Sequence, residues 1–330
     1  MTGLYVGWGR PNSWGEALAA DLGAQVMFTQ EAMTDARLIW EKAPIRYLAD
    51  VRRSLRAVAA CKPAFLMWQV PPSVGPILIQ GGWQGRVPWG LDVHSGAVNL
   101  WRWKWLLPVL RSVAQRAAVT VVHNREIAAL IRPWPSPVVV VDNYVVRASE
   151  APAPRERQRQ GPVIVVASGA VDEPLHLVVG AAELLGDEYE VIVTGRRRAV
   201  LRRLGRGQLP TNVRLTGFLS RPEYLDLLAS ACMAVCLTDR TATMQLGAWE
   251  AVSLGCPVVV SEQSVLREYF GGAAEFTGHY PDALAACIRQ VRMEHPRYLA
   301  AAKTMAAAMR EFRARQLQEV RHRLGLVRAT

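Results

Sequence analysis

One stretch of the sequence joins a polar loop to the start of a helix and a carboxylate. Thr238 to Pro257 reads TDRTATMQLGAWEAVSLGCP, and its pattern predicts a helix from about Gly247. The loop residues are Thr243, Met244, Gln245 and Leu246. Their backbone amides would meet an anion at the positive end of that helix. Glu250 falls one turn in, where its carboxylate can accept both hydroxyls of a ribose. Burial of this carboxylate against a structural cation would contradict that role.

Two other strand ends in the same half carry small or basic residues. Small residues at the end of VIVVASG let the backbone approach a phosphate, and a guanidinium after YEVIVTG can hold a diphosphate through paired donors. The alternative is that the arginines simply begin a solvated helix. The candidate residues are Ser168, Gly169, Thr194, Gly195, Arg196, Arg197 and Arg198.

The N-terminal half opens with a comparable loop, in YVGWGRPNSW, directly after a predicted strand. Asn12 or Ser13 is placed to cap the helix that follows. This loop is a candidate phosphate or acceptor contact, and the alternative is a plain turn. Its residues are Gly7, Trp8, Gly9 and Arg10.

A second candidate group in this half is the pair Asp92 and His94, in GLDVHSGAVN. The segment is expected to place them on opposite sides of a short strand end, in a glycine-flanked loop. Most lone histidines are structural, but a histidine and a carboxylate here are candidate catalytic groups.

These residues must be positioned by alternating strands and helices. Short β-branched runs alternate with longer helical patterns in both halves, which predicts an α/β fold with two doubly wound domains. Strands are expected at GLYVGW, AQVMFT, AFLMWQV, PILIQGG, VTVVHN and VVVVDN, then at VIVVASG, YEVIVTG, VRLTG, MAVCLT and PVVVSE. The proline-rich, charged stretch 147–161 is the expected linker.

Composition narrows the class of protein. The formal charge of +11 suits a solvated surface, a phosphate-bearing ligand, a membrane surface or a nucleic acid, but no recognition helix, zinc finger or basic arm supports nucleic-acid binding. No apolar run is long enough to span a bilayer, and no secretory signal is seen, so a cytoplasmic protein is expected. The five cysteines form no CxxC pair and are expected to be small buried residues.

The order VRLTGFLSRPEYLDLLASACMAVCLT, then MQLGAWEAVSLGCPVVVSE, resembles the donor domain of GT-B glycosyltransferases in the retaining family 4 group. The resemblance covers about Val163 to Phe270 well, and the N-terminal half more loosely. It implies two Rossmann-like domains facing a central cleft, with the acceptor domain at 1–146, the nucleotide-sugar domain at 162–280, and C-terminal helices at 281–330 that pack back on the first domain.

The same resemblance assigns roles to individual residues. Phe218 and Leu219 would border the base, Glu250 would hold the ribose, and His94 would contact the donor sugar. The glycine-rich loop would lie under the diphosphate and beside the acceptor.

The sequence also departs from the family. The usual first glutamate, eight residues before the second, is replaced by Ala242, so Thr243, Gln245 or Asp239 would contact the sugar instead. The usual basic pair after the first donor-domain strand is missing. Alternative diphosphate cations are Arg196, Arg197, Arg198, Arg240 and Arg10.

The reaction implied is transfer of a sugar from a nucleoside diphosphate to an acceptor hydroxyl, with retention. The nucleotide-sugar is a co-substrate, and no cofactor is expected. No DxD motif is present, so no metal is expected. Rival readings are a nucleotide-sugar 2-epimerase on the same fold and a non-catalytic binding scaffold.

A last motif, WRWKW, alternates Trp101, Trp103 and Trp105 with Arg102 and Lys104. Interleaved indoles and cations suit a membrane interface, where each indole lies at the water boundary. The alternative is core packing of a helix start. A glycolipid or other membrane-proximal acceptor, at the inner face of the membrane, is one expectation.

Overall fold

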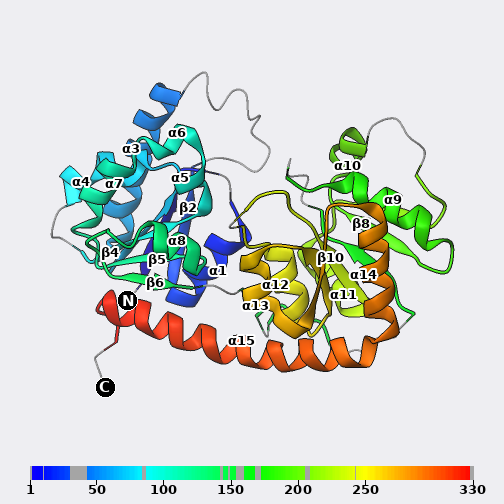
Figure 1. The fold of residues 1–330 in the computed structure, drawn as a ribbon. Helices are drawn as coiled ribbons and strands as arrows, with labels where there is room; N and C mark the ends of the chain where they lie inside the picture. Colours follow the sequence, from blue (N-terminus) through cyan, green and yellow to red (C-terminus); the bar gives the residue numbers. More distant parts are fainter. Residues whose placement is uncertain are drawn as a thin grey trace. The chain divides into compact units, whose positions relative to one another are not determined.

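The chain divides into two compact units. Unit 1 comprises Met1–Asp142 and Arg313–Thr330, and unit 2 comprises Asn143–Phe312. The computed structural model describes residues 2–9, 11–29, 43–83, 87–141, 144–147, 149–153, 160–167, 172–204, 209–241 and 243–327. The long helix α15 (His295–Arg323) starts in unit 2 and ends in unit 1, the unit that also holds the N-terminus (Figure 1).

Unit 1 is built on a parallel sheet of six strands in the order β2-β1-β3-β4-β5-β6. The strands are β1 (Gly3–Gly7), β2 (Ala24–Phe28), β3 (Leu66–Val70), β4 (Trp89–Val93), β5 (Val119–Val122) and β6 (Val138–Val140). The helices are α1 (Ser13–Leu22), α3 (Ala43–Cys61), α4 (Val74–Trp83), α5 (Ser95–Asn99), α6 (Trp101–Lys104), α7 (Leu107–Ala114) and α8 (Arg125–Leu130).

Unit 2 has a second parallel sheet, in the order β12-β11-β10-β7-β8-β9. Its strands are β7 (Val163–Val165), β8 (Val191–Thr194), β9 (Val213–Gly217), β10 (Met233–Cys236), β11 (Val258–Ser261) and β12 (Ala274–Thr277). Its helices are α9 (Leu175–Leu185), α10 (Arg197–Leu204), α11 (Arg221–Ser230), α12 (Leu246–Ser253), α13 (Ser264–Phe270), the short η1 (Gly271–Ala273) and α14 (Pro281–Met293).

The two sheets explain the β-branched runs in the sequence. Strands such as VTVV and VVVS are buried at every position, as expected where helices cover both faces of a parallel sheet. The predicted α/β class with two doubly wound sheets is therefore confirmed.

Two elements differ from the prediction. The run PILIQGG was expected to be a strand but lies in helix α4, and β12 had not been anticipated. A short, continuously apolar run fits a buried strand and a buried helix equally well, because it has no polar positions from which the period of either element could be read. Helix α4 packs on α3 and α7, and this tertiary packing decides the conformation.

The expected boundaries also differ from the observed units. The first sheet's unit ends at Asp142, so Tyr144 and Val146 belong to unit 2. Helix α14 lies in unit 2 as well, packed on α9, and only the end of α15 belongs to unit 1.

All five cysteines are free, but they are not all buried. Cys61 is exposed and Cys287 is half-buried, which corrects the expectation of uniformly buried thiols. Within the described residues, no helix is both long enough and apolar enough to cross a bilayer.

Candidate functional site

The polar centre of unit 1 is the buried carboxylate of Asp92, on β4. Its side chain has no solvent exposure and accepts hydrogen bonds on both oxygens. Tyr5 Oη donates to Oδ2 at 2.5 Å, and His94 Nε2 lies 3.1 Å from the same oxygen. His123 Nε2 lies 3.1 Å from Oδ1. One carboxylate therefore holds two imidazoles.

The sheet brings these groups together. His94 follows β4 and His123 follows β5, and the parallel register pairs Val93 with Val122. Both histidines therefore leave the sheet at the carboxyl ends of adjacent strands, where ligands collect in folds of this kind. His123 was not anticipated from the sequence, although a histidine directly after each of two strands was a signal that could have found it.

The relation of Asp92 to His94 corrects the sequence prediction. The two residues were expected on opposite sides of the strand end, but they are hydrogen-bonded to each other. Residues two apart in a strand point to the same face, and His94 continues that alternation beyond the last residue of β4.

The network continues toward the glycine-rich loop. Tyr5 Oη lies 3.1 Å from Gln69 Oε1, which accepts a hydrogen bond from Asn12 Nδ2 at 2.8 Å. Asn12 also caps α1, accepting from the backbone of Gly15 at 2.8 Å. A Cβ at Gly15 would lie 2.9 Å from Tyr5 Oη, so glycine permits this close approach. The start of α1 is thereby tied to the Asp92 carboxylate.

The loop residues themselves divide into two kinds. Trp8 lies in the core, where its indole donates to Ser54 Oγ at 2.9 Å and stacks on Tyr47. Its side chain anchors the loop and is not open to a ligand. Gly7 ends β1, Gly9 is half-buried, and Arg10 lies outside the described residues.

Burial and charge set the protonation of this cluster. Burial opposes ionisation of Asp92, but the charge of His94 and the hydrogen bonds from both histidines hold the pKa of that carboxyl well below its usual range. Burial, together with the charge of His94, lowers the pKa of His123 to about 4. Burial and the Asp92 charge raise the pKa of Tyr5. At neutral pH the centre is an ionised carboxylate beside a neutral His123.

His94 is the more exposed of the two histidines. The His94 side chain is 23% exposed and that of His123 is 15% exposed, and His123 is also stacked on Trp14 with ring centroids 4.2 Å apart. His94 is therefore the group placed to contact a ligand, and Asp92 and His123 are placed to orient it. The ligand atoms of Asp92, His94 and His123 lie within 4.8 Å of one another, close enough to be considered as metal ligands.

The lowered pKa of His123 predicts a pH-dependent stability. An unfolded histidine titrates near 6.5 and the folded one near 4, so this contribution to stability is complete above about pH 6.5 and is lost progressively as the pH falls from about 6.5 to about 4. The loss attributable to His123 is expected to reach about 3 kcal/mol. Thermal unfolding at pH 7 and pH 4.5 should show a smaller difference for His123→Gln than for the wild type. An unchanged difference would contradict the assignment.

The polar centre of unit 2 is the buried carboxylate of Glu250, on α12. It is 4% exposed, and its Oε1 forms an ion pair with Arg221 Nη1 from the start of α11. Arg221 Nη2 donates to Tyr144 Oη at 2.8 Å, and Glu150 lies 3.8 Å from the same nitrogen. Burial raises the pKa of Glu250, while Arg221 acts in the opposite direction.

This ion pair is the observation that tells against the simple ribose-binding role of Glu250. The cation that would oppose that role is present, supplied from another helix rather than at helical spacing. A ligand hydroxyl that reaches this carboxylate must share it with Arg221. Arg221 therefore enters the candidate site, although the sequence had not singled it out.

The loop before α12 lies as predicted, with the helix beginning at Leu246 rather than Gly247. Gln245 Nε2 donates to the Leu237 carbonyl at 2.6 Å, which ties the loop to the end of β10. A Cβ on Gly247 would lie 2.5 Å from Val166, so the helix start approaches β7 closely. Thr243 and Met244 are half-buried, and Ala242 lies outside the described residues.

The remaining donor candidates follow β8 and β9. Thr194 is buried, and its hydroxyl binds the backbone of Val165 and Ala167. Gly195 has a φ of 99° and packs against the Ala167 carbonyl, a conformation that excludes a side chain. Arg196 is exposed and lies over the ring of Phe218, 5.8 Å from its centroid. Phe218 is itself exposed, Leu219 is half-buried, and Ser168 and Gly169 lie outside the described residues.

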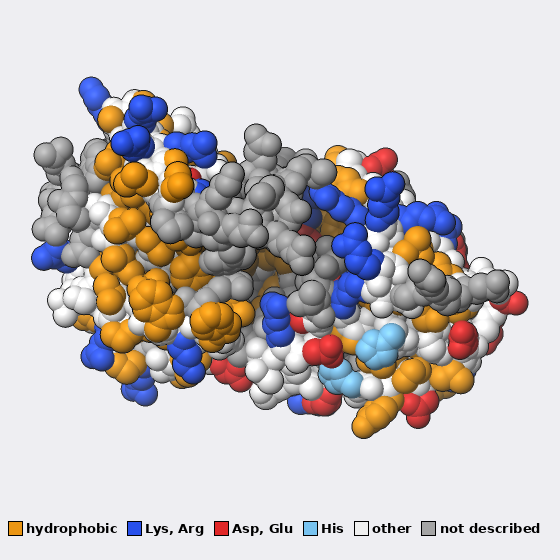
Figure 2. Space-filling view, turned by 90° about the horizontal axis from the view of Figure 1, so that it is seen from above, with side chains coloured by type: hydrophobic (Ala, Val, Ile, Leu, Met, Phe, Trp, Pro, Cys, Tyr) orange, Lys and Arg blue, Asp and Glu red, His pale blue; other side chains and the backbone are white. Residues whose placement is uncertain are grey.

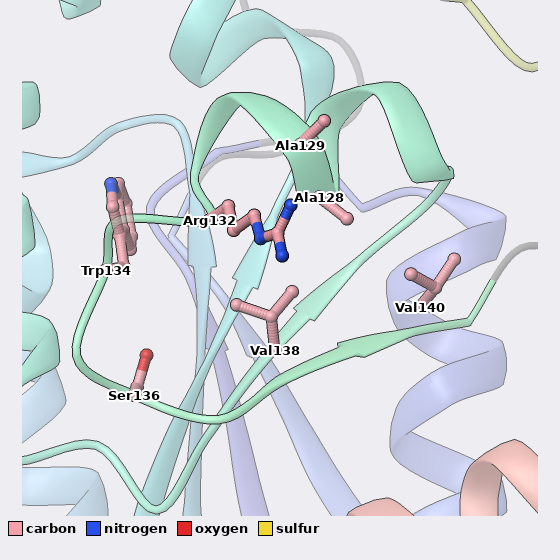
Figure 3. Close-up of a pocket in the computed structure, with 7 residues that line it drawn as sticks. All are labelled: Ala128, Ala129, Arg132, Trp134, Ser136, Val138 and Val140. Atoms are coloured by element: carbon pink, nitrogen blue, oxygen red, sulfur yellow. The ribbon is translucent and has the colours of Figure 1, made fainter.

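A separate cavity of about 430 Å³ lies beside β6 (Figure 3). Arg132 projects over it, and the Ser136 hydroxyl is hydrogen-bonded to the Thr120 hydroxyl at 2.6 Å. The other side chains that line the cavity are apolar. None of the residues Asp92, His94 and His123 lines it. The lining residues are Ala128, Ala129, Arg132, Trp134, Ser136, Val138 and Val140.

Comparison with known families finds a match in the second half of the chain. Residues 161–294 match the family described as glycosyl transferases group 1, over less than half of the chain. No curated protein matches the sequence. The matched range includes the Glu250 site and the loop before α12.

Comparison with solved structures identifies the fold. Anabaena HepE in complex with UDP and glucose is 14% identical, with a TM-score of 0.71 over 99% of this chain and 100% of that one. Sucrose-phosphate synthase from Thermosynechococcus elongatus is 13% identical, with a TM-score of 0.68 over 98% and 99%. A proposed UDP-N-acetylglucosamine 2-epimerase from Listeria monocytogenes is 12% identical, with a TM-score of 0.63 over 99% and 98%. The predicted resemblance to GT-B glycosyltransferases is confirmed.

Proposed function

We propose that this protein is a glycosyltransferase that moves a hexosyl or related sugar from a nucleoside-diphosphate sugar to an acceptor hydroxyl, with retention of anomeric configuration. The observation that carries the proposal is that the matched segment 161–294 contains both Glu250 and the loop before α12. Cell-surface polysaccharide or glycolipid assembly is the proposed setting, at the inner face of the membrane.

The donor is proposed to bind along the strand ends of unit 2. Backbone amides of the loop residues 243–246 hold the diphosphate at the start of α12, where the helix dipole favours an anion. Arg196 is the proposed diphosphate cation, and Phe218 and Leu219 border the base. The nucleotide-sugar is a co-substrate in this proposal, and no cofactor is proposed.

Glu250 is proposed to accept the ribose hydroxyls beside Arg221. Arg221 occupies Oε1, and a carboxylate offers about four acceptor positions in all, so the pair does not exhaust it. In this arrangement Arg221 opposes the burial that raises the pKa of Glu250, and the ion pair fixes the orientation of the carboxylate.

The chemical step is proposed to depend on charge stabilisation. The bond between the anomeric carbon and the phosphate oxygen breaks, and a bond to the acceptor oxygen forms on the same face. The departing phosphate takes the proton of the acceptor hydroxyl, and its charge is held by amides and an arginine. His94 contacts the donor sugar, and Asp92 is its positioning residue.

A second candidate is a nucleotide-sugar 2-epimerase, since the Listeria monocytogenes neighbour carries that description on the same fold. An epimerase needs no acceptor and releases a free sugar or an epimer. A non-catalytic scaffold, the third candidate, would bind nucleotide without turnover.

A panel of nucleotide-sugars, incubated with and without acceptor and followed by NMR, tests the proposal. The expected result is acceptor-dependent release of a nucleoside diphosphate, with slow hydrolysis when acceptor is absent. Activity is expected to persist in EDTA, because the sequence has no DxD motif. Acceptor-independent epimer formation would favour the epimerase. A complete loss in EDTA that a divalent cation reverses would contradict the metal-free mechanism and direct attention to Asp92, His94 and His123.

A further inference from the structure

One face of unit 1 exposes large apolar side chains on neighbouring helices. Trp101 is 82% exposed and Trp105 is 69% exposed, and Figure 2 shows apolar side chains gathered over this unit. We call this the apolar face. Its large exposed residues are Ile45, Leu48, Leu78, Trp101, Trp105 and Val109.

The helices that carry these residues lie side by side. Helix α4 packs on both α3 and α7, and α6 directly precedes α7 in the chain. Trp103, between the two exposed indoles, is buried, which corrects the expectation that all three tryptophans share one surface. Trp103 therefore fixes the short helix to the core while Trp101 and Trp105 remain outside. Contiguous exposed apolar area of this kind usually marks a binding surface.

On the chain segments that carry this face, the described exposed charges are all of one sign. Between residues 43 and 83 and between 87 and 116, the described acidic residues are Asp50 and Asp92, and both are buried. The exposed charges on these segments are basic. They include Arg52, Arg53, Arg56, Lys104, Arg111 and Arg116.

We propose that the apolar face docks on the surface of an anionic bilayer. Indoles prefer the headgroup level, where the ring is in an apolar setting and its N–H meets water. Arginine and lysine beside them pair with lipid phosphates, and each adds about 1 kcal/mol near an anionic surface. The absence of exposed carboxylates among the described residues of these segments removes the repulsion that would oppose this contact.

A second copy of the chain fits this face less well than a bilayer does. A two-fold interface places the same patch on both partners, so the basic residues would meet their own counterparts. Like charges brought together in this way cost free energy, whereas anionic lipid neutralises them.

This inference deepens the proposed function by naming the surface that meets the membrane, but it rests on the apolar face alone. Vesicle binding requires neither donor nor acceptor. A protein that does not bind vesicles would contradict this inference but not the proposed sugar transfer. A protein that transfers no sugar would contradict the proposed function but not the membrane contact.

The test is co-sedimentation of the full chain with vesicles of phosphatidylcholine alone or of phosphatidylcholine mixed with phosphatidylglycerol. The wild type is expected to bind the anionic vesicles, more weakly as salt is raised. Trp101→Ser combined with Trp105→Ser is expected to weaken this binding at least about tenfold. Lys104→Gln combined with Arg111→Gln is expected to weaken it about 30-fold and to reduce its salt dependence.

The matched control is Leu184→Ser combined with Met293→Ser, which removes two exposed apolar residues from unit 2. It is expected to bind vesicles like the wild type. The melting temperature of every variant reports folding, and sedimentation velocity reports self-association. Each of three results would overturn the proposal. These are a wild-type protein that fails to bind anionic vesicles, a tryptophan variant that binds them as well as the wild type does, and a dimer that the tryptophan changes abolish.

Discussion

Asp92→Asn is expected to lower kcat for sugar transfer by about 10²- to 10⁴-fold. The carboxylate holds His94 and His123 through separate oxygens, each at 3.1 Å, and it is completely buried. An asparagine keeps the volume but removes the charge and turns one acceptor into a donor. His94 would then lose the charged hydrogen-bond partner that fixes its imidazole.

The readout must separate positioning from folding. KM for the donor is expected to change less than kcat, because the proposed nucleotide contacts lie in unit 2, and the pH profile of kcat should shift. Tyr5→Phe is the matched control, since it removes another hydrogen bond to Asp92 but leaves both imidazole contacts. It is expected to retain kcat within about tenfold. An Asp92→Asn enzyme with wild-type kcat and an unchanged pH profile would refute the positioning role.

The second large effect is expected at Glu250. Glu250→Gln is expected to weaken nucleoside-diphosphate binding on the order of 10²-fold, because hydrogen bonds to a charged acceptor contribute about 1.5–3 kcal/mol. The substitution also leaves Arg221 without its buried partner, so the melting temperature should fall. Isothermal titration of UDP and other nucleoside diphosphates measures the first effect, and a thermal melt measures the second.

Arg221→Met decides between the two roles of Glu250. If Glu250 contacts the ribose directly, removal of Arg221 should weaken binding much less than Glu250→Gln does. If the two variants lose binding equally, Glu250 acts by holding Arg221, and the ribose assignment is wrong. The control is Glu190→Gln, which removes an exposed ion pair with Arg214 at the amino ends of β8 and β9. It should leave nucleotide binding unchanged.

The Arg221–Glu250 pair and the Asp92–His123 pair show why site residues are harder to predict than helices and strands. Arg221 and Glu250 are 29 residues apart, and Asp92 and His123 are 31 apart. The histidines that follow two strands are a local signal, but no local pattern shows that Arg221 pairs with Glu250 or His123 with Asp92. Each forms because the order of parallel strands brings separate chain segments to one sheet edge.

By itself, the sequence determined the alternation of strands and helices, a cap of α1 at Asn12 or Ser13, of which the structure selects Asn12, and the start of the Glu250 helix within one residue. These features depend on periodicity, capping and helix-end preferences, which act over a few residues. Tertiary structure alone decided that PILIQGG is a helix, that Trp103 is buried, and that Asp92 and Glu250 acquire charged or titratable partners. The reason is physical: burial and long-range pairing depend on which surfaces meet, and neighbouring residues in the chain do not specify that.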